Sequence, residues 1–222
     1  MIRAAIFDMD GTLVNSEGCW RNAEREVFGA VGIEITEAMS AVTAPMTPRQ
    51  VTEHWYQHQP WPDPQFDEME SAVVRRVAEQ LRDECLALPG AREALQRCRS
   101  LGWRIALASN SPALLCELVL ERLGFAGYFH EVVSVDDVER GKPDPDIYLL
   151  AARRLGVEPR ECVAFEDTPT GATAALAAGM RVVAIPSAGQ DFGHVRPHFM
   201  LRGLDEFRDE HASQLARPAS PN

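Results

Sequence analysis

Short runs of apolar residues recur along the chain and predict the strands of a buried sheet. Strands covered on both faces show continuous hydrophobic runs instead of strict alternation, and parallel sheets contain many of them. We expect five such strands and a weaker sixth, over residues 2–8, 103–109, 131–135, 162–166, 181–186 and 199–201.

Segments with helical periodicity fill the gaps between these strands. We expect helices over residues 91–101, 112–124, 145–156 and 169–179. The last three each open on a capping residue followed by proline, and each ends at a glycine, as helices prefer: Ser111-Pro112, Asp144-Pro145 and Thr168-Pro169. Strands that alternate with helices of this length predict an α/β fold with a doubly wound, Rossmann-like parallel sheet.

The long stretch between the first two strands has a different pattern. Apolar residues step by four from Met69 to Cys85, which indicates a long amphipathic helix, and residues 16–31 and 47–58 are helical in pattern too. We therefore expect an α/β catalytic core from residues 1–15 and 87–211, and a helical cap domain, residues 16–86, inserted after the first strand. A disordered tail is expected over 212–222.

Composition and charge narrow the possible partners. The 222 residues are 45% hydrophobic and 25% charged, which is ordinary for a soluble globular protein. A net charge of −11 argues against nucleic acid and anionic membrane surfaces, since both are bound through basic patches. Five scattered cysteines without a C-x-x-C pair indicate reduced thiols. With no signal-peptide pattern and no long apolar run, we expect a cytoplasmic protein. We expect it to be a monomer or a weak homodimer.

Polar side chains follow four of the expected strands or their neighbouring loops. These segments are Asp8-Met9-Asp10-Gly11-Thr12, Ser109-Asn110, Gly141-Lys142-Pro143 and Glu166-Asp167. In an open α/β sheet, ligands bind outside the carboxyl ends of the strands. Several carboxylates, a hydroxyl group and an ammonium group are therefore expected at one rim.

This mixture of groups points to phosphate chemistry assisted by a divalent cation. Converging carboxylates repel one another, so a hard cation such as Mg²⁺ is expected among them. Ser109, Asn110 and Lys142 are the expected substrate-binding residues, and Lys142 is the single lysine beside 21 arginines. Asp8 can attack phosphorus and form an acyl phosphate, while Asp10 can protonate the leaving oxygen and later deprotonate water.

These motifs resemble those of the haloacid dehalogenase superfamily of phosphotransferases. FDMDGTLV at residues 7–14, the strand that ends in Ser109, Gly141-Lys142-Pro143 and FEDTPTG at residues 165–171 occur in the order of that family. The resemblance implies Asp8 as nucleophile and Asp10 as acid and base, with the phosphoryl group held by Ser109 and Lys142. It implies Mg²⁺ bound by Asp8, the backbone carbonyl of Asp10 and Asp167, with Glu166 nearby.

The chain is most similar to the β-phosphoglucomutase-like subgroup with a helical cap. The segment WYQHQPW at residues 55–61 resembles bacterial hexitol phosphatases, also described as 2-deoxyglucose-6-phosphate phosphatases. The resemblance implies hydrolysis of a small phosphorylated metabolite, a sugar or sugar-alcohol phosphate. A phosphomutase is the nearest alternative. A haloacid dehalogenase is less favoured, because those relatives lack the second aspartate, and a catalytically silent binding protein is disfavoured by the intact motifs.

Four departures from the family pattern concern the substrate side. Asn15-Ser16-Glu17 stands where many relatives have Asp-Ser-Glu, and Thr47 occupies the position of a cap arginine. Trp20 stands where the mutase relatives have a histidine, and the cap contains no lysine. The polar groups that would hold a bisphosphate intermediate are thus missing from those positions, which favours a phosphatase over a mutase.

Other readings of individual residues are weaker. A calcium loop around Gly11 would place Ile6 at the first ligand position and a strand where a helix belongs. His54 and His58 could share a helix face as metal ligands, but an exposed face is the better interpretation. The aromatic residues Trp55, Tyr56 and Trp61 are expected to pack the cap, and Asp136-Asp137 is expected in a solvated loop.

Overall fold

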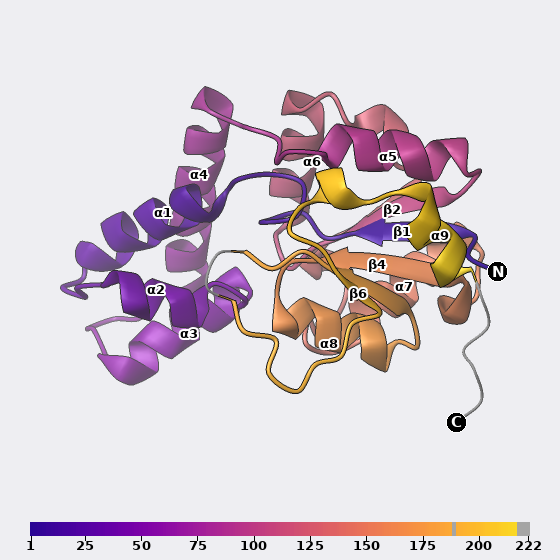
Figure 1. Cartoon of the computed structure of the whole chain (residues 1–222). Helices are drawn as coiled ribbons and strands as arrows, with labels where there is room; N and C mark the ends of the chain where they lie inside the picture. Colours follow the sequence, from indigo (N-terminus) through magenta and orange to yellow (C-terminus); the bar gives the residue numbers. More distant parts are fainter. Residues whose placement is uncertain (188–189, 217–222) are drawn as a thin grey trace.

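A computed structural model of the chain describes residues 1–187 and 190–216. Within these residues six strands form one parallel sheet, in the order β3-β2-β1-β4-β5-β6 (Figure 1). The strands are β1 Ala4–Phe7, β2 Arg104–Ala108, β3 Glu131–Val133, β4 Cys162–Glu166, β5 Arg181–Ala184 and β6 Phe199–Met200. The central strand β1 lies between β2 and β4, so its carboxyl end is flanked by both neighbours.

Helices cover both faces of the sheet, because each strand sends alternate side chains to opposite sides. Ala5 and Phe7 of β1 pack into one apolar cluster, and Ala4 and Ile6 pack into the other. The first face is covered by α5 (Ala91–Ser100), α6 (Ala113–Arg122) and α9 (Asp209–Leu215), and the second by α7 (Asp146–Leu155) and α8 (Pro169–Ala177). The doubly wound α/β architecture predicted from the sequence is confirmed.

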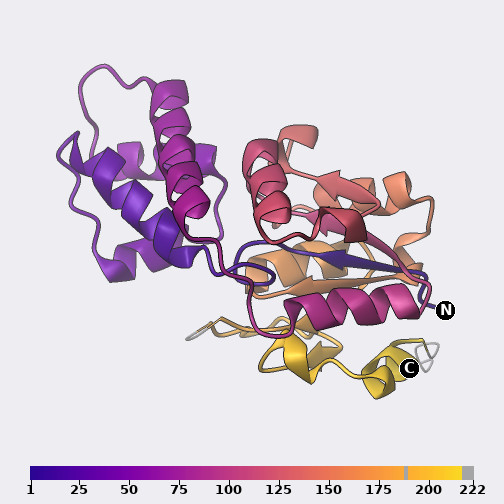
Figure 2. The same ribbon diagram turned by 90° about the horizontal axis from the view of Figure 1, so that it is seen from above.

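Four helices between β1 and α5 lie beyond the carboxyl ends of β1 and β4 (Figures 1 and 2). They are α1 (Glu17–Gly29), α2 (Glu37–Thr43), α3 (Pro48–His58) and α4 (Phe66–Asp83). Helix α4 packs against both α1 and α3. The chain enters and leaves this region side by side, since Asn15 N donates to Leu86 O at 3.0 Å and Leu88 N donates to Leu13 O at 2.9 Å.

The aromatic residues of this region pack against one another, as expected. Trp55 and Trp61 are buried, and the rings of Tyr56 and Trp61 meet edge to face with centroids 5.0 Å apart. His54 contacts the Trp55 ring. In the described parts of the chain, no cluster of metal-ligating side chains includes His54 or His58.

The expectation of a disordered tail is wrong in part. The tail is helical up to Leu215, as part of α9 (Asp209–Leu215), because Ala212 and Leu215 bury their side chains in the core; residues 217–222 lie outside the described range. Asp136 and Asp137 are exposed, as expected, and both also have partners: Asp136 Oδ2 accepts from the N–H of Ala113 at the start of α6, and Asp137 pairs with Arg154 at 2.6 Å. Helix α2 was not predicted; Thr36 caps it by accepting from Met39 N.

The sequence predicted that Ser111 caps α6, but the structure shows that it does not. Pro112 has extended backbone at the cap position, so the helix begins at Ala113, and Asp136 supplies the capping oxygen instead. The Ser111 hydroxyl is thereby released for another partner, Asp10, at 2.6 Å.

No helix among the described residues is long and apolar enough to cross a membrane.

Candidate active site

The turn after β1 holds the two motif aspartates at the rim of the sheet. Asp8 N donates to Phe165 O at 3.0 Å, which fixes the end of β1 against β4. Gly11 has a φ of 78°. A Cβ at this position would overlap the Asp167 carboxylate, so only glycine permits the turn to pass so close to the end of β4.

Asp8, Glu166 and Asp167 form a buried acidic cluster. Each offers a carboxylate oxygen, and these oxygens lie within 4.8 Å of one another. Glu166 is fully buried, and a Cβ at Gly171 would overlap its carboxylate, so the first turn of α8 also needs a glycine.

Lys142 partly neutralises this cluster. Its Nζ donates to Asp8 Oδ1 and to Glu166 Oε1, both at 2.6 Å. Asn110 positions the lysine backbone, accepting from Lys142 N at 2.8 Å and donating to Lys142 O at 3.1 Å. Tyr148 OH, from α7, donates to Glu166 Oε1.

The electrostatic state of the cluster reflects burial first. Burial raises the pKa of Asp8 well above its usual range, against the opposing effect of Lys142, and Glu166 and Asp167 raise it further. Burial and then Glu166 raise the pKa of Asp167 to about 7, although Ser187 donates to its Oδ2 at 2.8 Å. Burial acts to lower the pKa of Lys142, but the attraction of Asp8 and Glu166 is larger in sum, and its pKa is raised. The cluster sets three carboxyl groups against one lysine, so ionisation of all three would leave negative charge that Lys142 alone does not compensate.

The donor set fits a divalent cation. Three carboxylates at one buried position are the oxygen ligands that such ions bind. Glu166 Oε2 is buried without a hydrogen-bond partner, and buried acceptors of this kind are normally satisfied. A cation or a water bound to it would satisfy this oxygen.

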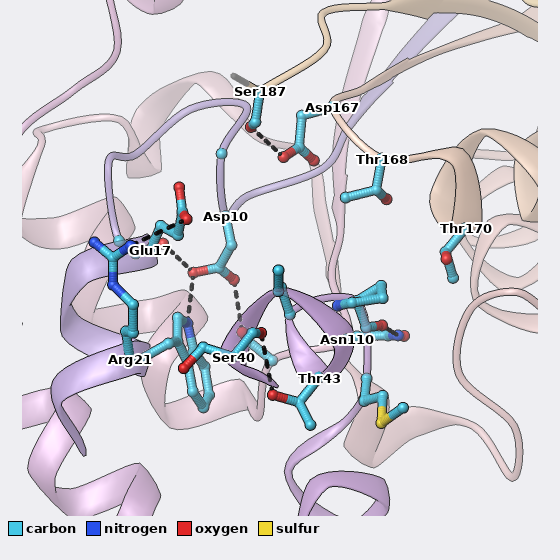
Figure 3. Close-up of a pocket in the computed structure, with 18 of the residues that line it drawn as sticks. Asp10, Glu17, Arg21, Ser40, Thr43, Asn110, Asp167, Thr168, Thr170 and Ser187 are labelled. Carbon is cyan, nitrogen blue, oxygen red and sulfur yellow. Dashed lines mark hydrogen bonds and ion pairs between the residues drawn. The ribbon is translucent and has the colours of Figure 1, made fainter. Parts of the chain in front are cut away.

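The Asp10 carboxylate has neutral partners, unlike the carboxylates of the cluster. Oδ1 accepts from Ser16 Oγ at 2.5 Å and from Trp20 Nε1 at 3.0 Å; Oδ2 accepts from Ser111 Oγ at 2.6 Å and, more distantly, from Ser109 Oγ at 3.5 Å. Figure 3 shows Asp10 turned towards these groups while Asp167 faces Ser187. The two motif aspartates thus have different surroundings, as different chemical roles require.

A cavity of ~540 Å³ lies between the strand ends and the region of helices α1 to α4, called the cap below. This volume suits a small metabolite. Asp8, Asp10, Ser109, Lys142 and Asp167 line the side formed by the core. The opposite side is formed by α1, α2, the following loop and the start of α3, including Trp20, Glu24, Ser40, Thr43, Met46 and Val51. Asn110 joins the two sides, since its Nδ2 also donates to Pro45 O at 3.2 Å.

The structure brings the predicted residues together but gives some of them unexpected contacts. Asp8, Lys142, Glu166 and Asp167 meet in the acidic cluster. Ser109 lines the cavity and accepts from Ser111 N at 3.0 Å, and the Asp10 side chain lies outside the group of three carboxylates that could hold a metal ion.

Sequence reasoning missed several residues of the site. Ser111 was interpreted as the capping residue of a helix. Trp20 was considered only because it stands where the mutase relatives have a histidine. Tyr148 lies in an apolar helix, Ser187 lies in a loop, and Glu24 lies among the polar residues of an amphipathic helix; none of the three belongs to a motif. A signal existed for Tyr148 alone: a polar-tipped ring on the sheet-facing side of a helix needs a buried partner.

A parallel α/β sheet with an acidic cluster, a lysine and a second aspartate at its carboxyl edge defines an enzyme of phosphoryl transfer. The family model for haloacid dehalogenase-like hydrolases matches residues 2–179, and the chain belongs to that family.

Proteins of known activity resemble the chain over most of its length. Hexitol phosphatase B of Escherichia coli O157:H7 is 37% identical over 208 residues, covering 92% of this chain and 94% of that protein. Fructose-1-phosphate phosphatase of Escherichia coli K12 is 36% identical over 181 residues, covering 80% and 93%. The crystal structure of β-phosphoglucomutase from Clostridium difficile has the same fold, with a TM-score of 0.86, 21% identity and 97% of each chain covered. The chain is a phosphatase.

Proposed function

We propose that this protein hydrolyses a sugar or sugar-alcohol monophosphate in a Mg²⁺-dependent reaction with an aspartyl-phosphate intermediate on Asp8. The contact of Lys142 with Asp8 beside Asp167, at a cavity that Asp10 also faces, is the observation that carries this proposal. The names of the relatives support the substrate class, since two of them act on a hexitol phosphate and on fructose 1-phosphate.

The chemistry divides between the two aspartates. The Asp8 carboxylate attacks phosphorus, and the bond from phosphorus to the ester oxygen breaks. The leaving oxygen takes a proton from Asp10, which is then a carboxylate. In the second half, Asp10 takes a proton from water, the resulting hydroxide attacks the acyl phosphate, and inorganic phosphate and free Asp8 are formed.

The neighbouring groups stabilise the charge that develops. Lys142 is held at Asp8, where it can neutralise oxygens of the transferring group. Asp8, Asp167 and Glu166 would hold Mg²⁺, which supplies, when bound, electrostatic stabilisation of the phosphoryl oxygens. Ser16, Trp20 and Ser111 hold Asp10 in place through its hydrogen bonds.

A specific feature of the cavity favours hydrolysis over mutase activity. Lys142 and Arg21 are the cations that line it in the described chain. Lys142 is paired with Asp8 and Glu166 of the acidic cluster. Arg21 is paired with Glu37 at 3.1 Å and with Glu17 at 3.7 Å. A mutase must hold a second phosphate group at the cap side, and these contacts leave no uncompensated cation there to bind it.

Phosphate release and metal dependence test this function. The protein treated with a chelator should release no phosphate from sorbitol 6-phosphate, and Mg²⁺ should restore activity. Asp8→Asn should lower activity to background, because the amide is a far poorer nucleophile, whereas Asp83→Asn, an exposed aspartate of α4, should not.

Two results would overturn the proposal. One is near-normal turnover by the Asp8 variant, or a beryllium fluoride adduct found on another residue of the wild-type protein. The other is conversion of β-glucose 1-phosphate to glucose 6-phosphate faster than inorganic phosphate appears, which would establish the mutase instead.

A further inference from the structure

Three polar residues of the cap line the cavity on the side opposite the acidic cluster. Glu24 comes from α1, and Ser40 and Thr43 come from α2, three residues apart and so on one helix face. All three line the cavity, yet their exposed fractions are 4%, 8% and 1%. They belong to none of the family motifs.

The hydrogen bonds of this group are incomplete. Thr43 Oγ1 shares its proton between Glu24 Oε2 at 3.0 Å and Ser40 O at 3.2 Å, and a dashed line leaves the Thr43 hydroxyl in Figure 3. Ser40 Oγ is buried without a partner. The Glu24 carboxylate also has a hydrogen bond from the Trp55 side chain.

A buried polar atom without a hydrogen-bond partner, such as Ser40 Oγ, destabilises a protein unless something binds it. Ser40 lines the cavity, so a ligand can supply the missing partner. A hydroxyl group suits the position, because it accepts from the Ser40 hydroxyl and can also donate to the Glu24 carboxylate, whose oxygens each accept more than one hydrogen bond.

The charges around this group disfavour an anion. Glu24 itself is acidic, Glu37 lies on the same helix as Ser40, and Arg21 is already paired with Glu37 and Glu17. A second phosphate or a carboxylate on the substrate would meet these acids without a cation of its own.

We propose that Glu24, Ser40 and Thr43 form a hydroxyl-binding subsite that recognises the uncharged polyol end of the substrate, opposite its phosphate. The subsite selects polyhydroxylated monophosphates over short phosphate esters and over bisphosphates. This inference rests on the proposed function and deepens it by naming residues that choose the substrate class.

The test compares three esters on matched variants: sorbitol 6-phosphate, glycerol 3-phosphate and fructose 1,6-bisphosphate. Glu24→Gln and Ser40→Ala should lower kcat/KM for sorbitol 6-phosphate on the order of tenfold more than for glycerol 3-phosphate, because only the longer substrate reaches the subsite. Glu24→Gln should also raise the relative activity on the bisphosphate, since one negative charge is removed. A merely structural residue would lower all three activities together.

Glu26→Gln is the matched control. Glu26 lies on the same helix, exposed and paired with Arg76 at 2.7 Å, so this variant should leave all three ratios unchanged. Phosphatase activity with unchanged ratios in the Glu24 and Ser40 variants would overturn the inference and leave the proposed function standing. Wild-type protein that hydrolyses none of the esters would overturn both.

Discussion

The two sides of the cavity are built in opposite ways. On the core side, charged groups are buried in direct contact, and Lys142, Asp8 and Glu166 are tied by two bonds of 2.6 Å. Two glycines make room for the carboxylates of that side. On the cap side, Arg21 pairs with Glu17 and Glu37 at the edge of the lining. Glu24, the hydroxyls of Ser40 and Thr43 and several apolar side chains form the rest, and the Ser40 hydroxyl has no partner.

This difference separates the residues that we propose for the reaction from those that we propose for selecting the substrate. The core contacts join residues far apart in the chain, such as Asp8 and Lys142, through strands whose register fixes their ends. Any change there disturbs several charges at once. The cap contact between Glu24 and Thr43 joins two neighbouring helices of one inserted segment. Cap residues can therefore be exchanged without moving the reacting groups, so a substitution on either side should have a characteristic effect.

The largest effect should come from Lys142. Lys142→Ala should lower kcat on the order of 10²-fold or more, because a positioned charge at the transferring phosphoryl group is lost. Lys142→Arg should be nearly as damaging, since a planar guanidinium cannot occupy the buried point between Asp8 and Glu166. Steady-state hydrolysis of sorbitol 6-phosphate measures both.

The matched control for Lys142 is Arg140→Ala. Arg140 is exposed, pairs with Asp144 and Asp146, and does not line the cavity, so its loss should leave kcat unchanged. An active Lys142→Arg enzyme would show that charge alone matters on the core side and that the close fit of the lysine does not.

Trp20 tests the boundary between the two sides, because this cap residue contacts a core aspartate. Trp20→Phe removes the N–H that donates to Asp10 Oδ1. We expect kcat for sorbitol 6-phosphate to fall about tenfold, as loss of a hydrogen bond to a charged group predicts. The fall should be smaller for p-nitrophenyl phosphate, whose leaving group departs without a proton from Asp10.

Trp61→Phe provides the comparison for Trp20. Trp61 packs among cap aromatic rings and does not line the cavity, so the ratio of the two activities should stay constant. Equal losses on both esters in Trp20→Phe would mean that the indole acts only by packing.

Sequence alone predicted the fold and the core side of the cavity well. Continuous apolar runs marked the strands. Acidic or basic residues at the strand ends or in the loops that follow identified Asp8, Lys142, Glu166 and Asp167, because parallel strands deliver their ends to one rim. Whether these residues have the proposed roles stays a prediction. The cap side could not be predicted. Glu24 looks like any polar residue of an amphipathic helix, and its contact with Thr43 depends on how two helices cross.

Ser111 shows a second limit of sequence reasoning. Ser-Pro before a helix is a good capping signal, and Asp136, remote in sequence, took that role instead. The choice between two capping oxygens depends on tertiary structure, and local pattern does not contain it.

The smallest expected effect concerns stability and Glu24. Burial raises the pKa of Glu24 from 4.5 to about 7, with hydrogen bonds from Thr43 and Trp55 acting in the opposite direction. The folded state therefore holds a proton that the unfolded chain releases between these two pH values. The free energy of unfolding should fall as pH rises through this window, and the stabilisation from Glu24 is complete only below about pH 4.5. Glutamine does not titrate, so Glu24→Gln should remove this slope. Relative to the variant, the wild type should lose about 2 kcal/mol between pH 5 and pH 8. Urea unfolding at the two pH values measures the difference, and the exposed Glu26→Gln should follow the wild type. Parallel pH profiles of the wild type and Glu24→Gln would show that Glu24 is solvated like an ordinary surface carboxylate. The contrast between the two sides of the cavity would then rest on the acidic cluster alone.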